Sequence, residues 1–335
     1  MNEPTVSVVV PAYRGGELFD LCLRSLRQLS PPPLETLIVA DGQCRDSAER
    51  ARAAGFRVIT LDEQSGPAIA RNCGAAEARG GILFFVDADV TVRPDACARI
   101  VRAFADPGRA ALIGSYDNAP AATNFLSQYK NLAHRFVHQR ADPDGFTFWG
   151  ACGAIRSDVF RAVGGFDARY REASIEDIEL GYRLRRHGYR ITVDRSLEVT
   201  HLKRWSATSL LRADIGRRAL PWSALILQEG RLHNDMNLRV AQRIAVALTW
   251  LLAAALVAAM GTDVPIAIAV AVAAALLLLD LPLWRYLGRA RGGWFVARSV
   301  PWHWLVYLLS GGAFAWAFVR HVLSSTRIRR AMEPA

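Results

Sequence analysis

Five consecutive apolar residues, Ile82 to Val86, are followed at once by an Asp-Ala-Asp sequence, Asp87 to Asp89. A strand without polar residues indicates a parallel sheet, because helices cover both faces of such a sheet. Ligands of open α/β sheets bind at the carboxyl ends of the strands. Asp87 and Asp89 are therefore placed to hold a divalent cation and, through it, a phosphate. An acidic turn after a buried strand is the simpler interpretation of an Asp-x-Asp sequence taken alone.

Strand-like and helix-like segments alternate in the region that precedes this strand. Their order predicts a doubly wound, mostly parallel α/β sheet of the Rossmann-like kind. Neither a Gly-x-Gly-x-x-Gly sequence after the first strand nor a Gly-Lys-Ser/Thr loop is present, which disfavours dinucleotide-binding and P-loop functions. We predict strands at 6–10, 34–40 and 57–61, and helices at 17–29, 46–54 and 67–79.

Three of the predicted strands end in residues suited to ligand binding. Because the carboxyl ends of parallel strands lie at one edge of the sheet, these residues would line one nucleotide-sized crevice. They are Pro11, Ala12 and Tyr13 after the first strand, Asp41 after the second, and Asp87 and Asp89 after the fourth.

Apolar residues are distributed unevenly along the 335-residue chain. Hydrophobic residues make up 52% of it, and the mean hydropathy of +0.13 is high for a soluble protein. Charges occur throughout the sequence up to about Asn237, whereas long runs of Ala, Leu and Val follow Ile244. We therefore expect a soluble head and a membrane-embedded tail. The net charge of +10 suits nucleic acid or an anionic membrane surface, and the apolar segments favour the membrane and no nucleic acid.

The cysteines indicate a reducing environment. They are odd in number and form no Cys-x-x-Cys pair, so neither a zinc site nor a disulfide framework is expected. The head is therefore expected in the cytosol. No basic stretch followed by an apolar run begins the chain, which predicts the absence of a signal peptide. The five cysteines are Cys22, Cys44, Cys73, Cys97 and Cys152.

Eight short sequence blocks resemble, in their order, those of family 2 glycosyltransferases with the GT-A fold. The resemblance covers roughly the first two thirds of the chain, and the blocks are individually weak but jointly specific. The blocks are Val6–Tyr13, Val39–Gly42, Ala70–Gly74, Val86–Asp89, Trp149–Ala154, Val163–Asp167, Ile175–Arg183 and His201–Trp205.

The resemblance implies a nucleoside-diphosphate sugar as donor. Asp41 would bind the base or ribose, Tyr13 would lie near the base together with Pro11 and Ala12, and Arg71 would lie near the uridine or the diphosphate. UDP is favoured because the family uses it most often, with GDP and dTDP left open.

The resemblance also implies a divalent cation, Mg²⁺ or Mn²⁺. Asp89 would hold this cation with help from Asp87. We expect Asp87 to be a sugar or ribose contact rather than an equal metal ligand.

A second acidic sequence, Glu176-Asp177, begins a predicted helix that Ser174 can cap. Helix capping alone would explain these acids. Inverting glycosyl transfer, however, needs one carboxylate to take the proton of the acceptor hydroxyl. The resemblance assigns this role to Asp177, with Glu176 as a neighbour or an alternative.

The sequence His201 to Trp205 occupies the place of the Gln-x-x-Arg-Trp motif of processive family members, with His in place of Gln. Arg204 can pair with a diphosphate, and Trp205 can stack on a sugar. His201 is either a metal ligand or a histidine bonded to the backbone. The loss of Gln weakens the case for polymer synthesis.

The region between the two acidic sequences contains an aromatic helix, in which Phe125, Tyr129 and Phe136 repeat at helical spacing and face the core. His134 and His138 are four residues apart on it. They form a possible metal pair, but we interpret them as a polar face turned toward the acceptor or the membrane. Residues 142–145 are expected to form a turn.

The C-terminal third is predicted to associate with a membrane. Residues 206–237 read as amphipathic interface helices divided by Pro221, with a soluble helical subdomain as the alternative. Residues 244–260 and 264–283 are each near the minimum length of a span and would form a hairpin through the turn 261–263. An Arg-rich loop at 284–299 would lie on the cytosolic side.

A third apolar segment, 300–323, conflicts with the positive-inside rule. If it crosses the membrane, it places the basic tail, Arg327 to Arg330, outside. Either the tail violates the rule, or the segment is re-entrant or interfacial. Asp280, near the cytosolic end of the second span, is a functional candidate because charged residues in spans are costly.

Together these patterns predict a GT-A catalytic domain at 1–205, interface helices at 206–237 and a transmembrane region at 238–335. The expected function is inverting, metal-dependent sugar transfer to a membrane lipid or lipid-linked glycan. It would take place at the cytosolic face of the inner membrane of a cell, by a multi-pass enzyme of cell-envelope synthesis. A processive polysaccharide synthase and an inactive membrane scaffold are the alternatives.

Overall fold

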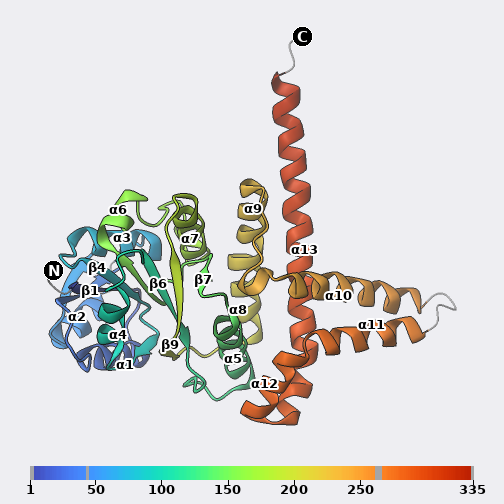
Figure 1. Cartoon of the computed structure of the whole chain (residues 1–335), viewed down its shortest axis with the longest axis horizontal. Helices are drawn as coiled ribbons and strands as arrows, with labels where there is room; N and C mark the ends of the chain where they lie inside the picture. Colours follow the sequence, from blue (N-terminus) through green and yellow to red (C-terminus); the bar gives the residue numbers. More distant parts are fainter. Residues whose placement is uncertain (1–3, 43–44, 261–265, 333–335) are drawn as a thin grey trace. The chain divides into compact units, whose positions relative to one another are not determined.

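The computed structural model describes residues 4–42, 45–260 and 266–332, and the last eight of these by their backbone alone. The described chain divides into two compact units, Met1–Trp205 and Ser206–Ala335 (Figure 1). Each unit is described by itself below. Cys44 and the turn predicted at 261–263 lie outside the described residues.

The first half of the sheet in the N-terminal unit is parallel and consists of four neighbouring strands. Their β-branched and aromatic residues are buried, as helices on both faces require. Phe84 and Phe85 of β4 are fully buried, and the Phe85 ring contacts the rings of Phe148, Phe160 and Phe166. In spatial order the strands are β3 (Arg57–Thr60), β2 (Glu35–Ala40), β1 (Val6–Ala12) and β4 (Ile82–Val86).

The second half of the sheet mixes parallel and antiparallel pairs. The α/β fold predicted from the sequence is therefore confirmed, with a mixed continuation of the parallel half. Residues 144–145, expected to lie in a turn, form a two-residue strand instead. Beyond β4 follow β8 (Cys152–Arg156), β6 (Ala111–Tyr116), β9 (Ile191–His201) and β5 (Val90–Val92), and β7 (Asp144–Gly145) pairs with β9.

Two antiparallel pairs position the residues after β4. The β4–β8 pair puts Val86, the last residue of β4, opposite Cys152. The β5–β9 pair puts Val90 opposite His201. As a result, the chain between Val86 and Val90, which contains both aspartates, is held at each end by a strand from the later part of the unit.

Seven helices are described in the N-terminal unit. The helices α1 and α3 show the expected pattern, with one face buried against the sheet. They are α1 (Glu17–Arg27), α2 (Arg45–Ala53), α3 (Pro67–Glu77), α4 (Ala96–Ala103), α5 (Phe125–Arg140), α6 (Ser157–Ala162) and α7 (Glu176–Arg186).

The described part of the C-terminal unit is helical. Two helical stretches, Val240–Ala258 and Gly293–Ser324, are long and apolar enough to cross a membrane, and α11 and α12 together pass the same test with a bend of 65° between them. The elements are α8 (Ala207–Leu211), a π-helix (Arg212–Ala219), α9 (Leu220–Glu229), a 3₁₀ turn (Met236–Leu238), α10 (Val240–Ala258), α11 (Ile266–Leu279), α12 (Leu281–Arg291) and α13 (Gly293–Met332).

The loop predicted at 284–299 is wrong. These residues belong to α12 and to the beginning of α13, a helix of 40 residues. Arginines suggested a solvated loop, but they are also good helix formers. The helix α11 instead ends at Leu279, and Asp280 is the N-cap of the next helix, α12, which has Pro282 in its first turn. A proline at this position favours a new helix over continuation of the old one.

Candidate active site

The carboxyl ends of β1 and β2 form one side of the candidate site. Pro11 and Ala12 are the last residues of β1, and Tyr13 beyond them is 41% exposed. Asp41 follows β2 and is buried, and its two oxygens accept the backbone N–H groups of Ser65 (2.7 Å) and Gly66 (2.9 Å). Asp41 therefore fixes the loop that leads into α3, next to the exposed Tyr13 edge. Its predicted contact with the donor stays a prediction.

Arg71 of α3 links the two acidic sequences that the sequence analysis treated separately. One guanidinium nitrogen, Nη2, lies 2.6 Å from Oδ1 of Asp87, and Nη1 lies 2.9 Å from Oε1 of Glu176. The Arg71 side chain is 5% exposed and that of Glu176 is 6% exposed. Two carboxylates 89 positions apart thus share one buried cation, and the strand end after β4 is joined to the start of α7.

The charges around Arg71 determine the protonation of the site. Burial of the guanidinium would lower its pKa, but the Asp87, Glu176 and Asp177 carboxylates outweigh burial and raise it. Burial raises the pKa of Asp87, and the neighbouring Asp89 carboxylate adds to the rise against the effect of Arg71. Arg71 therefore carries a permanent positive charge inside the site.

Asp177 lies at the start of α7, half-buried beside Arg71 and Glu176. Its Oδ2 accepts the backbone N–H of Gly150 at 3.1 Å, and its Oδ1 accepts the N–H of Ile178 at 2.8 Å. A Cβ atom at Gly150 would lie 2.9 Å from the Arg71 guanidinium carbon. Only a residue without a side chain fits between Asp177 and Arg71, which explains the glycine of the Trp149–Ala154 block.

The helix cap predicted at Ser174 is wrong. The N-cap residue of α7 is Ile175, and no side chain caps the helix. The backbone N–H of Ser174 instead donates to Oε2 of Glu176 at 2.8 Å. Glu176 therefore uses one oxygen for Arg71 and the other for the chain before its own helix, which leaves Asp177 as the more accessible acid.

Asp89 and His201 form the other end of the site. His201 Nε2 lies 3.8 Å from Asp89 Oδ2, and the histidine side chain is 6% exposed whereas that of Asp89 is 35% exposed. The backbone carbonyl of Asp89 accepts the N–H of Leu202 at 2.9 Å, which fixes the two segments together. Burial alone would raise the pKa of Asp89, but His201 and Lys203 lower it. The pKa values of the two aspartates therefore shift in opposite directions.

Asp89 and His201 fit a divalent cation as a two-ligand set. Neighbouring ligands of an octahedral cation with bonds of about 2.1 Å lie about 3 Å apart, so Asp89 Oδ2 and His201 Nε2, 3.8 Å apart, would have to approach each other by less than about 1 Å. In the described part of the chain, no group of three or more His, Cys, Asp or Glu residues is arranged to bind a metal. A cation here would therefore take its remaining ligands from a substrate or water, which is usual for Mg²⁺. Asp87, predicted as a further ligand, is paired with Arg71.

An aromatic cluster around His201 was missed by the sequence analysis. Tyr116, the last residue of β6, stacks on the His201 ring at 4.7 Å and contacts the His134 ring at 4.7 Å. His134 and His138 each lie 5.0 Å from the Trp149 ring. The position of Tyr116 at the end of a buried strand was the available signal, because strand ends formed the rest of the site.

The predicted polar face is wrong for His138, whereas the orientation of the half-buried His134 toward the acceptor stays a prediction. His138 is buried, and its Nδ1 lies 2.9 Å from the carbonyl oxygen of Gly114. Both rings pack inside the unit, against Trp149 and each other.

The segment after His201 presents a cation and an indole ring. Arg204 is exposed and has no hydrogen-bond or ion-pair partner among the described residues. The Lys203 ammonium lies 4.4 Å from the Trp205 ring centre. The backbone of Trp205 is bonded to Asn124 and Ser127 at the start of α5. The predicted donor contacts of Arg204 and Trp205 stay predictions.

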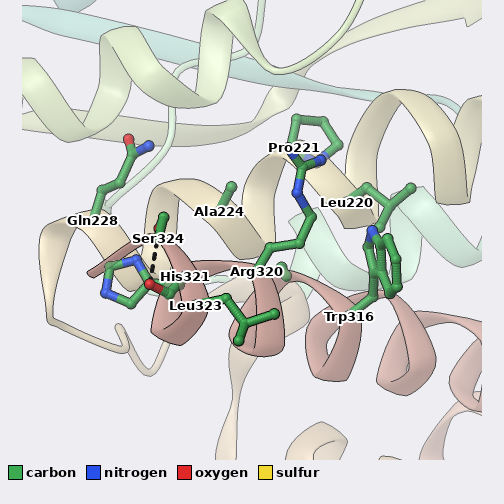
Figure 2. A pocket seen from close by; sticks show the side chains of 10 residues that line it. Leu220, Pro221, Ala224, Gln228, Trp316, Arg320, His321, Leu323 and Ser324 are labelled. Carbon is green, nitrogen blue, oxygen red and sulfur yellow. Dashed lines mark hydrogen bonds between the residues drawn. The ribbon is translucent and has the colours of Figure 1, made fainter. Parts of the chain in front are cut away.

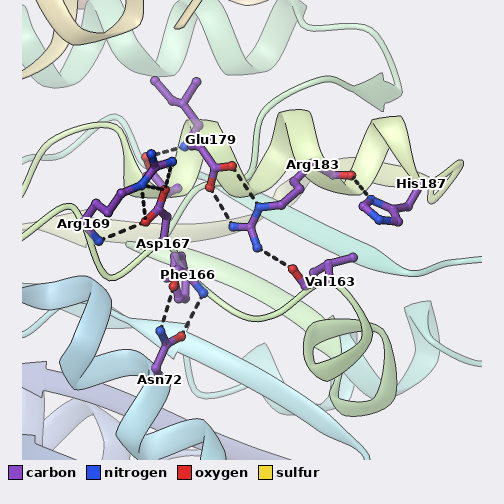
Figure 3. Close-up of polar contacts among 10 residues, drawn as sticks. Asn72, Val163, Phe166, Asp167, Arg169, Glu179, Arg183 and His187 are labelled. Carbon is purple, nitrogen blue, oxygen red and sulfur yellow. Dashed lines mark hydrogen bonds and ion pairs between the residues drawn. The ribbon is translucent and has the colours of Figure 1, made fainter. Parts of the chain in front are cut away.

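The Val163–Asp167 block is a loop that ties α3 to α7 (Figure 3). The Asn72 side chain donates to the Phe166 carbonyl and accepts its N–H, both at 2.8 Å. Arg183 pairs with Glu179 within α7 and donates to the Val163 carbonyl (Figure 3). The Phe166 ring lies 5.3 Å from the Arg71 guanidinium carbon. The Phe166 ring of this loop therefore packs against the Arg71 guanidinium and helps to fix its position.

Comparisons with known sequences agree with this geometry. Residues 7–164 match the sequence model of the family described as Glycosyl transferase family 2. A validoxylamine A glucosyltransferase of Streptomyces hygroscopicus subsp. limoneus is 27% identical over 227 residues, which cover 57% of this chain and 50% of that protein. The succinoglycan biosynthesis protein ExoA of Rhizobium meliloti is 26% identical over 196 residues, covering 55% and 59%. The chain spans about half the length, or less, of the first curated relatives it matches.

A solved structure shares the fold. The mannosyltransferase PcManGT from Pyrobaculum calidifontis, in complex with GDP-Man and Mn²⁺, superimposes with a TM-score of 0.65 at 20% identity, covering 94% of this chain and 88% of that one. The resemblance to family 2 is confirmed for the sequence blocks up to residue 164, and the GT-A type of fold is confirmed as well.

Proposed function

We propose, from the match of residues 7–164 to the sequence model of glycosyl transferase family 2, that this protein transfers a sugar from a nucleoside-diphosphate donor to an acceptor hydroxyl with inversion. The observation that carries the proposal is the Arg71 bridge, because it brings the acids after β4 and the acids of α7 into one site. Donor and acceptor chemistry then lie within reach of each other.

In the proposed reaction Asp177 takes the proton of the acceptor hydroxyl. The acceptor oxygen forms a bond to the anomeric carbon of the sugar, and the bond from that carbon to the diphosphate oxygen breaks. The nucleoside diphosphate leaves with the electron pair of that bond. Arg204, an exposed cation without a carboxylate partner among the described residues, neutralises its charge.

Asp41 and Tyr13, with Pro11 and Ala12, contact the nucleoside in this proposal. Arg71 is a positioning residue, since Asp87 and Glu176 occupy its guanidinium. Asp87 is held by Arg71 in an orientation suited to a sugar or ribose hydroxyl. Trp205 offers an apolar face on which a sugar ring can stack.

Asp89 and His201 would hold Mg²⁺ or Mn²⁺, which supplies neutralising charge to the diphosphate when it is bound. The solved neighbour from Pyrobaculum calidifontis contains Mn²⁺ and GDP-Man, which supports a divalent cation. A GDP-sugar is therefore an alternative to a UDP-sugar as the donor, and both are tested below.

The proposed acceptor is a membrane lipid or a lipid-linked glycan. The apolar helices of the C-terminal unit support membrane association. We propose a multi-pass protein of the inner membrane with its catalytic unit in the cytoplasm. The match to a succinoglycan biosynthesis protein supports a role in making cell-envelope or extracellular glycans.

The test is a transfer assay with membranes that contain the full chain. Labelled UDP-, GDP- and dTDP-sugars are supplied one at a time with Mn²⁺, and lipid-extractable label is measured. Asp177→Asn should lower transfer by about 10²- to 10⁴-fold, the usual contribution of a general base. Asp144→Asn is the matched control. Asp144 is an exposed acid outside the candidate site, and its Oδ1 pairs with Nη2 of Arg190 at 3.2 Å.

Retained turnover in both Asp177→Asn and Asp89→Asn would exclude the proposed mechanism. A polymer as product, rather than one added sugar, would favour a processive synthase. No turnover of any donor by the wild-type chain would favour an inactive scaffold.

A further inference from the structure

We propose that α13 lies along the membrane surface on the side of the catalytic unit, and that only the α10–α11 hairpin enters the bilayer. This inference rests on the proposed membrane association, and it is independent of the transfer chemistry. It follows from how three helices of the C-terminal unit pack together.

The helices α10 and α11 lie side by side and pack through small and branched residues. Leu252 and Ala255 of α10 form one buried cluster with Ala269, Val272 and Leu276 of α11. The described arms contain 19 and 14 residues, or roughly 28 and 21 Å of helix at 1.5 Å per residue. Such arms reach far into a hydrocarbon core about 30 Å thick.

One turn of α13 contacts both arms of this hairpin. The Tyr307 hydroxyl donates to Oδ1 of Asp280, at the end of α11, at 3.1 Å. The Trp250 indole of α10 donates to the Leu308 carbonyl at 3.1 Å. A Cβ atom at Gly311 would lie 2.4 Å from the Trp250 ring, so α13 and α10 approach closely there.

Figure 1 shows α13 running across the hairpin, and its contacts with both arms fall within the five residues from Tyr307 to Gly311. A helix aligned with the hairpin would instead follow an arm along several turns. The hairpin and α13 therefore cannot both stand along the bilayer normal.

The composition of the helices decides which of them enters the bilayer. The residues of α11 are all apolar, and the exposed positions of the hairpin are large apolar residues such as Val257, Ile266 and Leu278. The hairpin therefore has no face suited to water. α13, by contrast, carries Arg298, Arg320 and His321, and its tryptophans are of a residue type favoured at the headgroup level, whereas residues 244–258 and 266–279 of the hairpin contain no charged residue.

The neighbourhood of α9 adds a second observation. A cavity of about 610 Å³ lies between α9 and α13, and Figure 2 shows the Arg320 side chain reaching Pro221. Trp316, Leu323 and Gln228 also line the cavity. Arg320 has no carboxylate partner among the described residues. A cation beside tryptophan and leucine suits the level of lipid phosphates, whereas in hydrocarbon the same cation would be costly.

This arrangement removes the conflict found in the sequence. A hairpin enters and leaves the bilayer on one side, so a surface α13 keeps the tail, Arg327 to Arg330, on the same side as Arg285 and Arg289 of α12. All these arginines then satisfy the positive-inside rule.

The test compares the side of the two chain ends in a bacterial host. The full chain carries either a fluorescent protein that folds only in the cytosol or a phosphatase active only outside it, at its N-terminus or its C-terminus. We expect both ends on the same side. Ends on opposite sides would show that α13 crosses and would overturn the inference. Both ends outside the cytosol would overturn the proposed location of the catalytic unit and leave the inference standing.

A labelling experiment on the full chain tests the depth of α13. In a full chain whose five native cysteines are replaced by serine, Ser324→Cys should react with a membrane-impermeant maleimide only in vesicles that expose the side of the catalytic unit. Val257→Cys, in the hairpin and 70% exposed, is the matched control and should not react, because lipid surrounds it. Reaction of Ser324→Cys only from the opposite side would contradict the inference.

Discussion

Replacement of Arg71 by Met tests whether the buried bridge stabilises the catalytic unit. The substitution keeps most of the side-chain volume but leaves two carboxylates without their cation. Glu176 is only 6% exposed, so its charge would stay buried, whereas Asp87 is 33% exposed and keeps contact with water. Breaking a buried ion pair from one side costs about 3–5 kcal/mol. Most of this cost should come from Glu176.

The assay is thermal unfolding of the full chain in detergent. For a unit of about 200 residues, a loss of 3–5 kcal/mol lowers Tm by about 6–20 °C. Arg190→Met is the matched control, because it removes an arginine from an exposed ion pair with Asp144 and should cost less than about 1 kcal/mol. The double variant Arg71→Met, Glu176→Gln removes the stranded charge and should be more stable than Arg71→Met alone.

Two results would refute this reasoning. One is a Tm of Arg71→Met within the range of Arg190→Met. The other is a double variant no more stable than Arg71→Met, which would show that the stranded Glu176 charge is not the source of the loss.

Three further predictions concern pH, packing and the metal. Burial would raise the pKa of Glu35, but hydrogen bonds from the Arg79 N–H and the Ser7 hydroxyl lower it. Its stabilisation is therefore present above the unfolded pKa of about 4.3 and lost as pH falls further, so the Tm deficit of Glu35→Gln at pH 7 should shrink in acid. Gly181→Ala should lower Tm through a cost of about 1–3 kcal/mol, because its Cβ would lie 2.3 Å from the Phe148 nitrogen, whereas Gly216→Ala, with open space, should not. Chelation with EDTA should abolish transfer until Mn²⁺ is restored. His201→Ala should raise the Mn²⁺ concentration needed for half-maximal transfer, and an unchanged concentration would show that His201 is not a ligand of the cation.

Local patterns were enough to predict the first half of the sheet. The apolar run of β4 and the alternation before it specify strands and helices through short-range periodicity. The pairing of β4 with β8, and of β5 with β9, depends on residues about 70 to 110 positions apart. No periodicity within one segment carries this information.

The candidate site shows the same division. Asp87 and Asp89 were singled out because they follow a buried strand, and Asp177 because the resemblance to family 2 assigns the base to that position. That Arg71 would bridge Asp87 and Glu176 could not be found from their positions, since the bridge requires the three-dimensional approach of α3 and α7. Tyr116 was missed because an aromatic residue at a strand end is ordinarily a core residue.

The membrane region was predicted less well for a physical reason. Charged residues between two apolar segments suit a loop as well as an interfacial helix, and the sequence does not distinguish these. Asp280 was read as a residue within a span. It instead ends α11 and accepts a hydrogen bond from Tyr307.

The Arg71 bridge also restricts how such enzymes can recombine. A chimera that joins residues 1–140 of this chain to the later part of another family member would inherit Arg71 and Asp87 from one parent and the residue at 176 from the other. A second parent without an acid at position 176 would leave the buried Arg71 paired with Asp87 alone. Exchange of acceptor specificity between relatives is therefore expected to succeed where the acid at 176 and the glycine at 150 are transferred together.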